Sequence, residues 1–239
     1  MEGVLIFRLI CPFWASFRNH STVNVHVTYP FPPPSTIYGL LNAARGKPQD
    51  WHADRDEWRI GLVVENRGRL VETFSKVMKI YEDKRSAKER AAQSQSAKGV
   101  FDRTTLIRQK LLAPRYCVYM RASPDLLQEA VHALVNPHWP LYLGESDDLV
   151  DVQEPRIIGI DPSLDRRAHS IIPAIVAGCQ LVNVTVKFRR IGTRWTPVRR
   201  IYSLPPESRE VELPVPFQVY AIEGKKVVFD ERSDGTGQA

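Results

Sequence analysis

The sequence predicts an α+β fold in which two helices pack on one side of an antiparallel β-sheet. Two segments repeat apolar residues at helical spacing, several apolar or alternating runs have the length of strands, and the two kinds of segment alternate over the first 150 residues. Their order is strand, helix, strand hairpin, strand, helix and short strand, which is the βαββαβ order of the ferredoxin-like motif. A chain of 239 residues can form one large domain, or a main domain with an appendage.

The first strand is predicted at residues 3–10, an apolar run with one arginine that is typical of a buried central strand. Residues 11–20 (CPFWASFRNH) then combine aromatic rings with a basic side chain. This mixture suits single-stranded RNA, because bases stack on aromatic rings and arginine pairs with phosphates. Trp14 and Phe17 are better explained as core residues, so Arg18 and Asn19 are the predicted contacts.

Residues 23–29 alternate between apolar and polar side chains and predict a strand with His26 on its polar face. The stretch that follows, residues 29–46 (YPFPPPSTIYGLLNAARG), organises the first half of the chain. Residues 32–34, three consecutive prolines, hold the backbone extended, and Ser35 or Thr36 is expected to cap a helix. Arg45 and Gly46 suit the end of that helix. Its apolar stripe consists of Ile37, Leu40, Leu41 and Ala44.

Residues 59–65 predict a second core strand, residues 66–68 a turn, and residues 70–81 a long strand that completes a hairpin. The composition then changes at residues 82–103, which are polar and offer almost nothing to bury. We expect a solvated, mobile insertion there, partly helical. Its basic residues are Lys84, Arg85, Lys88, Arg90, Lys98 and Arg103.

Order is expected to return at residue 104, with a strand at residues 116–120. Arg108 and Lys110 directly after the insertion are predicted to contact RNA. A second helix starts after Ser123, and residues 141–143 predict a short strand. Gly144 in the following loop would let the backbone approach a phosphate. The carboxylates of Glu145, Asp147 and Asp148 invite a metal, but no further ligand cluster is evident in the sequence, and no metal or other cofactor is predicted.

Residues 151–239 are rich in strands and prolines and end in a polar tail, residues 230–239, that is expected to be disordered. Strict alternation at residues 181–188 predicts a strand that turns at residues 192–193 and returns through residue 202. This hairpin carries the densest basic patch of the chain and one aromatic ring, which predicts contact with RNA or a partner; an exposed hairpin kept soluble by arginine is the alternative. The patch consists of Lys187, Arg189, Arg190, Arg194, Trp195, Arg199 and Arg200.

Charge and cysteine content narrow the class of protein. The net charge is +6, and residues 1–120 hold 19 basic against 11 acidic side chains, whereas residues 121–239 hold 14 against 16. A basic first half indicates a polyanionic partner such as RNA or DNA, although soluble basic proteins without such a partner are common. Three widely spaced cysteines make no metal motif and suit a reducing cytoplasm, and no apolar run is long enough to cross a membrane.

Three motifs together resemble the CRISPR-associated Cas5 family. They are a strand ending in AxFR (Ala15 to Arg18), the segment YPFPPPST leading into a GLLxAAxG helix, and YLG followed by small and acidic residues at 142–148. The family belongs to the RAMP superfamily of ferredoxin-like folds, similar to the RNA-recognition motif. A glycine usually follows the first strand in this family, whereas Pro12 and Phe13 stand there in this chain, so the resemblance leaves that loop's conformation open.

The resemblance implies the subunit of a type I Cascade complex that holds the 5′ handle of the crRNA, in the cytoplasm, for defence against foreign DNA. Its partners would be the backbone and large subunits, with target DNA reached through the complex. It also implies an RNA-recognition-motif-like domain at residues 1–150, with residues 82–104 as a thumb, and a β-rich region at 151–239. Arg18, Asn19, Ser35, Gly144 and the basic patch would hold the handle, and Tyr29 and Trp195 would stack on bases.

Two other functions stay open on the sequence alone. A metal-independent endoribonuclease of the same superfamily needs a base for the ribose 2′-hydroxyl and a cation for the phosphate. Some family members use a tyrosine and a Lys-His pair, which is absent here, so His26 with Tyr29 or Tyr38 is the remaining pairing. A structural interaction module that makes no direct RNA contact is the third reading. We expect a non-catalytic RNA-binding subunit.

Overall fold

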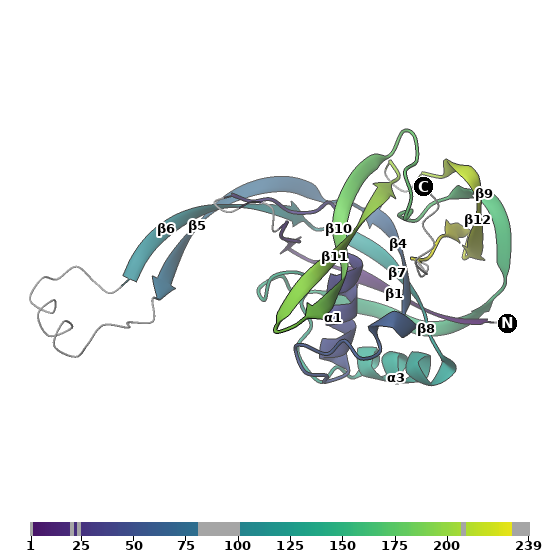
Figure 1. The fold of residues 1–239 in the computed structure, drawn as a ribbon, viewed down its shortest axis with the longest axis horizontal. Helices are drawn as coiled ribbons and strands as arrows, with labels where there is room; N and C mark the ends of the chain where they lie inside the picture. The colour runs from purple at the N-terminus through teal and green to yellow at the C-terminus, as the bar shows by residue number, and fades with distance from the viewer. Residues whose placement is uncertain (1, 20–21, 23–24, 81–100, 207–208, 231–239) are drawn as a thin grey trace, which may run out of the picture.

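The computed structural model describes residues 2–19, 22, 25–80, 101–206 and 209–230. These contain helices α1 (Pro34–Ala44) and α3 (Pro124–Val135), a short 3-10 helix η1 (Arg55–Glu57) and strands in four sheets (Figure 1). The strands are β1 (Glu2–Ile10), β2 (Trp14–Ala15), β3 (Val25–His26), β4 (Arg59–Asn66), β5 (Arg69–Ile80), β6 (Phe101–Leu112), β7 (Arg115–Arg121), β8 (Asp151–Ile160), β9 (Pro162–Ala168), β10 (Gln180–Ile191), β11 (Arg194–Leu204), β12 (Val211–Ile222) and β13 (Lys225–Val227).

The central sheet has the strand order β4-β7-β1-β8, and every neighbouring pair is antiparallel. Two predictions about this sheet are wrong. β4 pairs with β7 and β5 with β6, so the expected hairpin of residues 59–65 with 70–81 does not form. The strand that completes the sheet is β8, because residues 141–143 contribute only an isolated bridge between Tyr142 and Leu149. β8 lies beyond residue 150, so the sheet continues into the region predicted as β-rich and C-terminal.

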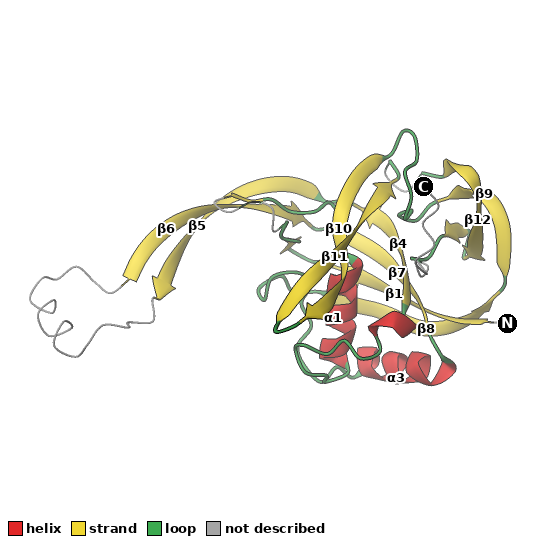
Figure 2. Ribbon diagram, viewed as in Figure 1, coloured by secondary structure: helices red, strands yellow, loops and turns green. Residues whose placement is uncertain are grey.

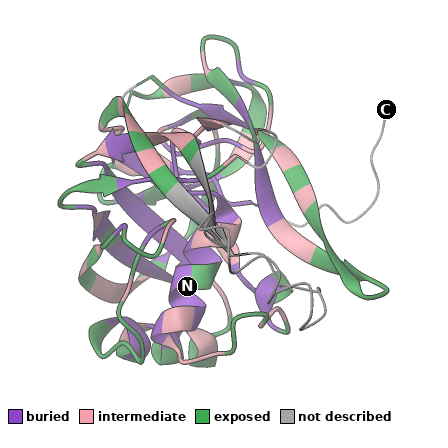
Figure 3. Cartoon of the chain, turned by 90° about the vertical axis from the view of Figure 1, so that its left-hand side faces the viewer, coloured by how far each residue is buried: buried purple, intermediate pink, exposed green. Residues whose placement is uncertain are grey.

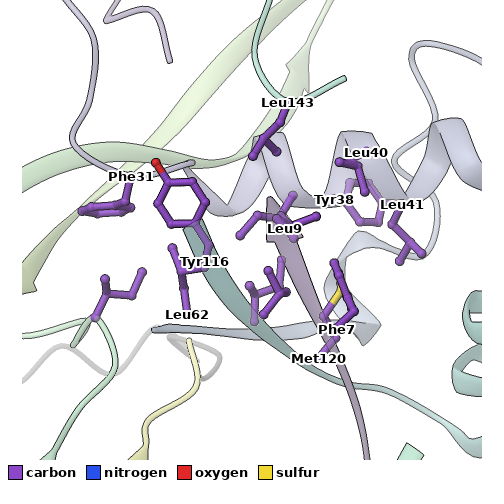
Figure 4. Packing of buried hydrophobic residues seen from close by; sticks show 14 of the residues in the cluster. Phe7, Leu9, Phe31, Tyr38, Leu40, Leu41, Leu62, Tyr116, Met120 and Leu143 are labelled. Atoms are coloured by element: carbon purple, nitrogen blue, oxygen red, sulfur yellow. The ribbon is translucent and has the colours of Figure 1, made fainter. Parts of the chain in front are cut away.

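Both helices lie on one side of the central sheet, as Figure 2 shows. Figure 4 shows Tyr38, Leu40 and Leu41 of α1 beside Phe7 and Leu9 of β1, in a core that also takes in β4 and β7. The apolar stripe predicted for α1 is therefore buried, each large side chain contributing roughly 1.5–3 kcal/mol.

The start of α1 differs from the sequence prediction. The helix begins at Pro34, and the capping position is taken by Pro33, with no side-chain cap. Ser35 and Thr36 thus lie inside the first turn, because proline, which lacks an N–H, suits the first helical position. The predicted end is confirmed, since Arg45 is the C-terminal cap and Gly46 follows in the left-handed conformation, with φ of 67°.

β5 and β6 form a two-stranded arm that extends away from the body (Figure 1). Near the body, β2 pairs antiparallel and β3 parallel with the other edge of β6. Within residues 25–29, the described part of the strand predicted at 23–29, only β3 forms, and His26 is 6% exposed instead of lying on a solvated face. Of the predicted thumb residues, Lys84, Arg85, Lys88, Arg90 and Lys98 lie outside the described residues, and Arg103 is described only as part of the backbone of β6.

The C-terminal strands form two further layers. β12 and β13, in a sheet of order β13-β12-β9, pack on the face of the central sheet opposite the helices, where Tyr220 and Phe229 join Ile6 and Tyr119 in a second core. β10 and β11 form a hairpin beside α1. Figure 3 shows buried residues concentrated in the central strands and exposed ones at loops and hairpin ends.

Asp230 is the predicted start of a disordered tail, but it is 8% exposed and pairs with the buried Arg55 at 3.2 Å. Its backbone N–H also donates to the carbonyl of Ile60 in β4. The chain is therefore anchored to the central sheet up to this residue, and residues 231–239 lie outside the described part. None of the helices in the described ranges is long and apolar enough to span a membrane.

Candidate nucleic-acid interface

A groove of about 280 Å³ lies where four segments meet: the chain after β2, the chain leading into α1, the loop before β8, and β10. Four of the residues that the sequence predicts to contact RNA line it, namely Arg18, Tyr29, Ser35 and Gly144. These residues lie far apart in the sequence, so the fold brings the separate motifs to one place. The other lining residues are Ser16, Phe17, Pro33, Thr36, Glu145, Thr185 and Phe188.

One wall of the groove is a short antiparallel pairing around Arg18 and Thr28. The N–H of Phe17 donates to the Thr28 hydroxyl at 2.8 Å, and the N–H of Tyr29 donates to the Phe17 carbonyl at 2.8 Å. The pairing leaves the Arg18 side chain exposed at the rim of the groove. A guanidinium held on such a frame can meet a phosphate with two hydrogen bonds.

Tyr29 is 6% exposed, so its ring is part of the groove wall and packs in the core. This position contradicts the expectation that the ring offers a face for stacking. Its hydroxyl donates to Asn19 Oδ1 at 3.3 Å, which orients the half-buried Asn19 side chain. Burial raises the pKa of the Tyr29 hydroxyl, and the charge of nearby Arg199 opposes that shift. Tyr29 thus stays a neutral hydrogen-bonding group close to a cation.

The N-terminus of α1 forms a second wall through Pro33, Ser35 and Thr36. The Ser35 hydroxyl donates to the Thr185 carbonyl at 2.9 Å, which joins the helix to β10. The positive end of a helix dipole faces this wall and favours an anion there. The proline-rich approach therefore places a helix terminus at the groove, and Ser35 acts mainly by fixing β10 against it.

The floor of the groove contains an ion-pair network that the sequence does not predict. Gly144 has φ of 114°, and a Cβ there would overlap the Ser16 carbonyl oxygen. The missing side chain of Gly144 therefore allows the two backbones to pack closely and does not make room for a phosphate. The Asp148 carboxylate, fully buried, accepts the Ser16 N–H at 2.7 Å and the Lys110 ammonium at 3.0 Å. Arg108 pairs with Glu145 at 3.0 Å.

Lys110 is a predicted RNA contact, but its side chain is 7% exposed and its ammonium group meets Asp148, Asp147 and the Trp14 ring. That position contradicts the prediction, because the charge is already engaged by carboxylates beneath the groove. Arg108 is likewise committed to Glu145, although it is half-buried. Glu145, Asp147 and Asp148 have carboxylate oxygens within 4.8 Å of one another, as a metal site would require, but these two cations already pair with them.

The β10–β11 hairpin places the predicted basic patch beside the groove. Arg199 lies opposite Thr185, a lining residue, and its charge acts on Tyr29. The exposed cations farther along the hairpin are Arg189, Arg190 and Arg194. Lys187 differs, since it is half-buried and pairs with Asp56. Most of the patch thus remains at the surface next to the groove.

Trp195 is 39% exposed and rests on His52, with ring centroids 4.7 Å apart. The ring centroid of His52 also lies 6.1 Å from that of Phe188 and 6.4 Å from that of Tyr38. The loop before η1 therefore supports the hairpin through an aromatic cluster. Burial lowers the pKa of His52, which favours the neutral ring. Sequence reasoning missed this support, and it also missed Thr185 and Phe188 as lining residues, because only tertiary packing brings them to the groove.

Comparison with solved structures shows a shared fold. A chain of a structure described as "CRISPR RNA-guided surveillance complex" superposes with a TM-score of 0.58 at 19% identity, over 89% of this chain and 91% of that chain. A structure described as "Crystal structure of a CRISPR protein from Archaeoglobus fulgidus" gives a TM-score of 0.50 at 13% identity, over 95% and 98%. The fold is therefore one found among proteins of CRISPR systems.

The family is shown by sequence. Residues 4–170, more than half of the chain, match the family model described as "CRISPR-associated protein (Cas_Cas5)". The chain belongs to this Cas5 family, which confirms the resemblance seen in its motifs. No curated protein sequence matches it significantly.

Proposed function

We propose that this protein is a non-catalytic, RNA-binding subunit of a type I CRISPR Cascade surveillance complex and that it caps the 5′ handle of the crRNA. Membership of the Cas5 family and a fold shared with a chain of an RNA-guided surveillance complex support the proposal that the protein is a Cascade subunit. The observation that carries the RNA role is the groove, which gathers Arg18, Tyr29 and Ser35 from distant motifs next to Arg199.

The groove suits a bent single-stranded RNA segment. Arg18 in the groove and Arg199, which lies opposite the lining residue Thr185, provide cations for phosphates, and the N-terminal end of α1 lines the groove. Asn19 and the Tyr29 hydroxyl provide polar groups for a base edge or a ribose hydroxyl. Arg189, Arg190 and Arg194 extend the positive surface along the hairpin, so a longer stretch of RNA would leave the groove over β10 and β11.

We infer that the central sheet with α1 and α3 is a ferredoxin-like unit related to the RNA-recognition motif. The support is its order β1, α1, β4, β7, α3, β8 and its strand arrangement, in which the third strand of the unit separates the first from the second. The β5–β6 arm is inserted between the second and third strands of this unit. It would carry the thumb that contacts the neighbouring backbone subunit, and the large subunit would join elsewhere on the protein.

Burial of the candidate base and hydroxyls supports a non-catalytic role. His26 is 6% exposed, and β3 holds it against β6. Tyr38 is 2% exposed and donates its hydroxyl hydrogen to Asp54, and burial together with that bond raises its pKa. A general base for the ribose 2′-hydroxyl must reach it directly or through one water. His26 and its two candidate partners, Tyr29 and Tyr38, are thus all buried.

The test is to incubate the purified protein with labelled CRISPR repeat RNA in EDTA and to run native and denaturing gels in parallel. A shift on the native gel without cleavage on the denaturing gel is the expected result. Arg18→Ala and Arg199→Ala should weaken the shift. Arg166→Ala removes the same charge from exposed β9 and should leave it unchanged. Site-specific cleavage would instead establish a nuclease, and the absence of any shift at low salt would contradict RNA binding.

A further inference from the structure

Two large aromatic side chains are exposed beside the groove. Phe13 is 63% exposed and Trp14 is 40% exposed, and their ring centroids lie 6.2 Å apart with planes inclined by 51°. The sequence alone favours a core role for Trp14, so this exposure is a finding of the structure. Neighbouring exposed rings leave apolar surface in contact with water, which is typical of a binding site.

The backbone around both rings is fixed. The Phe13 carbonyl accepts the N–H of Ala113 at 2.9 Å, and Trp14 in β2 pairs with Leu112 in β6. The Lys110 ammonium lies 4.8 Å from the centroid of the Trp14 ring and holds it by a cation–π contact. The backbone of both residues and the ring of Trp14 are therefore held before any ligand arrives, which reduces the entropy cost of binding.

The surroundings of the rings favour a polyanion. Arg69 in β5 and Trp14 in β2 both lie directly opposite Leu112, so these side chains share one face of the sheet. Arg115 follows the turn after β6 and is exposed, as Arg69 is. The charge of Lys110 is balanced by Asp148, and the exposed Asp147 adds a further negative charge close by. The net positive charge around the rings therefore comes from the two exposed arginines.

The rings also lie near the groove, because Ser16, Phe17 and Arg18 line it only two to five residues further along the chain. We propose that Phe13 and Trp14 form a second RNA subsite, a stacking platform for a base of single-stranded RNA that continues out of the groove. Arg69 and Arg115 on the adjoining strands contact the phosphates of that segment. This inference rests on the proposed RNA-binding function.

The experiment uses the full chain and synthetic single-stranded CRISPR repeat RNA that carries 2-aminopurine at one position at a time. Stacking on an aromatic ring quenches 2-aminopurine, so the wild type should quench at one position or a short run of positions. Phe13→Ala and Trp14→Leu should relieve that quenching and raise Kd by roughly 5- to 140-fold, the range expected when one base no longer stacks. Trp14→Phe keeps an aromatic face and should retain most of the quenching.

Phe74→Ala is the matched control. Phe74 is 78% exposed, but its position in β5 directs it to the sheet face opposite Arg69, so quenching and Kd should stay at the wild-type level. Urea unfolding of the Trp14 variants shows whether removing the partner of Lys110 disturbs the fold. Phe13→Ala removes a largely exposed ring and keeps the test valid if those variants are unstable.

The outcomes distinguish failure of the aromatic subsite from failure of the proposed RNA-binding function. If Arg18→Ala weakens RNA binding while Phe13→Ala and Trp14→Leu change neither quenching nor Kd, the subsite is refuted and the proposed function stands. If the two aromatic variants no longer bind a protein subunit but keep their RNA affinity, the surface is a protein contact and the subsite is again refuted. If the wild type binds no repeat RNA at low salt, the proposed function fails and the subsite fails with it.

Discussion

Replacing Asp148 with alanine should destabilise the protein strongly, because this carboxylate ties three segments together under the groove. It is fully buried and accepts hydrogen bonds from the Lys110 ammonium at 3.0 Å, the Ser16 N–H at 2.7 Å and the Glu145 N–H at 3.2 Å. Alanine leaves all three donors without this acceptor, and one of them carries a charge that is 7% exposed.

Removing one partner of a buried ion pair costs about 3–5 kcal/mol, and each unsatisfied buried N–H about 1–3 kcal/mol, partly offset by relaxation. We therefore expect Asp148→Ala to lower the free energy of unfolding by about 3–5 kcal/mol. Asp147→Ala is the matched control: its side chain is 60% exposed and lies 3.5 Å from the same ammonium, so its removal should cost less than about 1 kcal/mol.

Urea unfolding followed by tryptophan fluorescence measures both effects, with an unchanged slope showing that the unfolded state is the same. The double variant Lys110→Met/Asp148→Ala should be more stable than Asp148→Ala, because it also removes the cation that has lost its buried carboxylate. If Asp148→Ala is no more destabilising than Asp147→Ala, or if the double variant shows no recovery, the network does not hold the floor of the groove. Asp148→Asn, which keeps the shape, provides a milder test if the alanine variant fails to fold.

Three further predictions concern other parts of the fold. Gly144→Ala should destabilise by about 1–3 kcal/mol in urea unfolding, because φ is 114° and the new methyl group would overlap the Ser16 carbonyl; wild-type stability would contradict this close approach. Asp230→Ala should cost about 3 kcal/mol, since it leaves the buried Arg55 guanidinium without its carboxylate, and a cost below about 1 kcal/mol would show that the anchor is unimportant. Burial lowers the pKa of His52 below 6.5, so its contribution to stability should be complete above pH 6.5 and should be lost as the pH falls through the lowered pKa. His52→Phe should flatten this pH dependence of the thermal unfolding temperature, and an unchanged profile would exclude His52 as its source.

Local signals in the sequence are sufficient to predict the helices. Prolines 32–34, the apolar stripe and Gly46 predict α1 and its end, because each acts on the backbone within a few residues. The predicted capping residue is wrong for the same kind of reason: proline competes with serine for the start of a helix and takes the first position. The basic hairpin also follows from local alternation, with its turn at residues 192–193 between β10 and β11.

Strand partners are not predictable from local patterns. Residues 66–68 do connect two strands, but β4 pairs with β7, where Val64 lies opposite Tyr116, and β5 pairs with β6 across residues 81–100. β8 escapes prediction because its side chains are mostly half-buried or exposed, so it lacks the apolar run of an interior strand. Pairing depends on which surfaces the whole chain buries together.

The candidate site is predictable in part. Motifs that resemble the Cas5 family locate Arg18, Tyr29, Ser35 and Gly144, and the fold brings all of them to one groove. Their individual roles are less predictable, because burial decides them. Lys110 is neutralised by Asp148, a residue 38 positions away, and no local pattern indicates that pairing.

The most direct test of RNA binding is the salt dependence of the affinity for labelled single-stranded repeat RNA in EDTA, measured from about 50 to 200 mM salt. We predict a steep linear fall of log K with log salt, and a slope that becomes shallower by about 0.7 for each phosphate contact that Arg18→Ala or Arg199→Ala removes. A flat response of the wild type, or identical slopes in the wild type and both variants, would contradict the claim that this groove holds the RNA backbone.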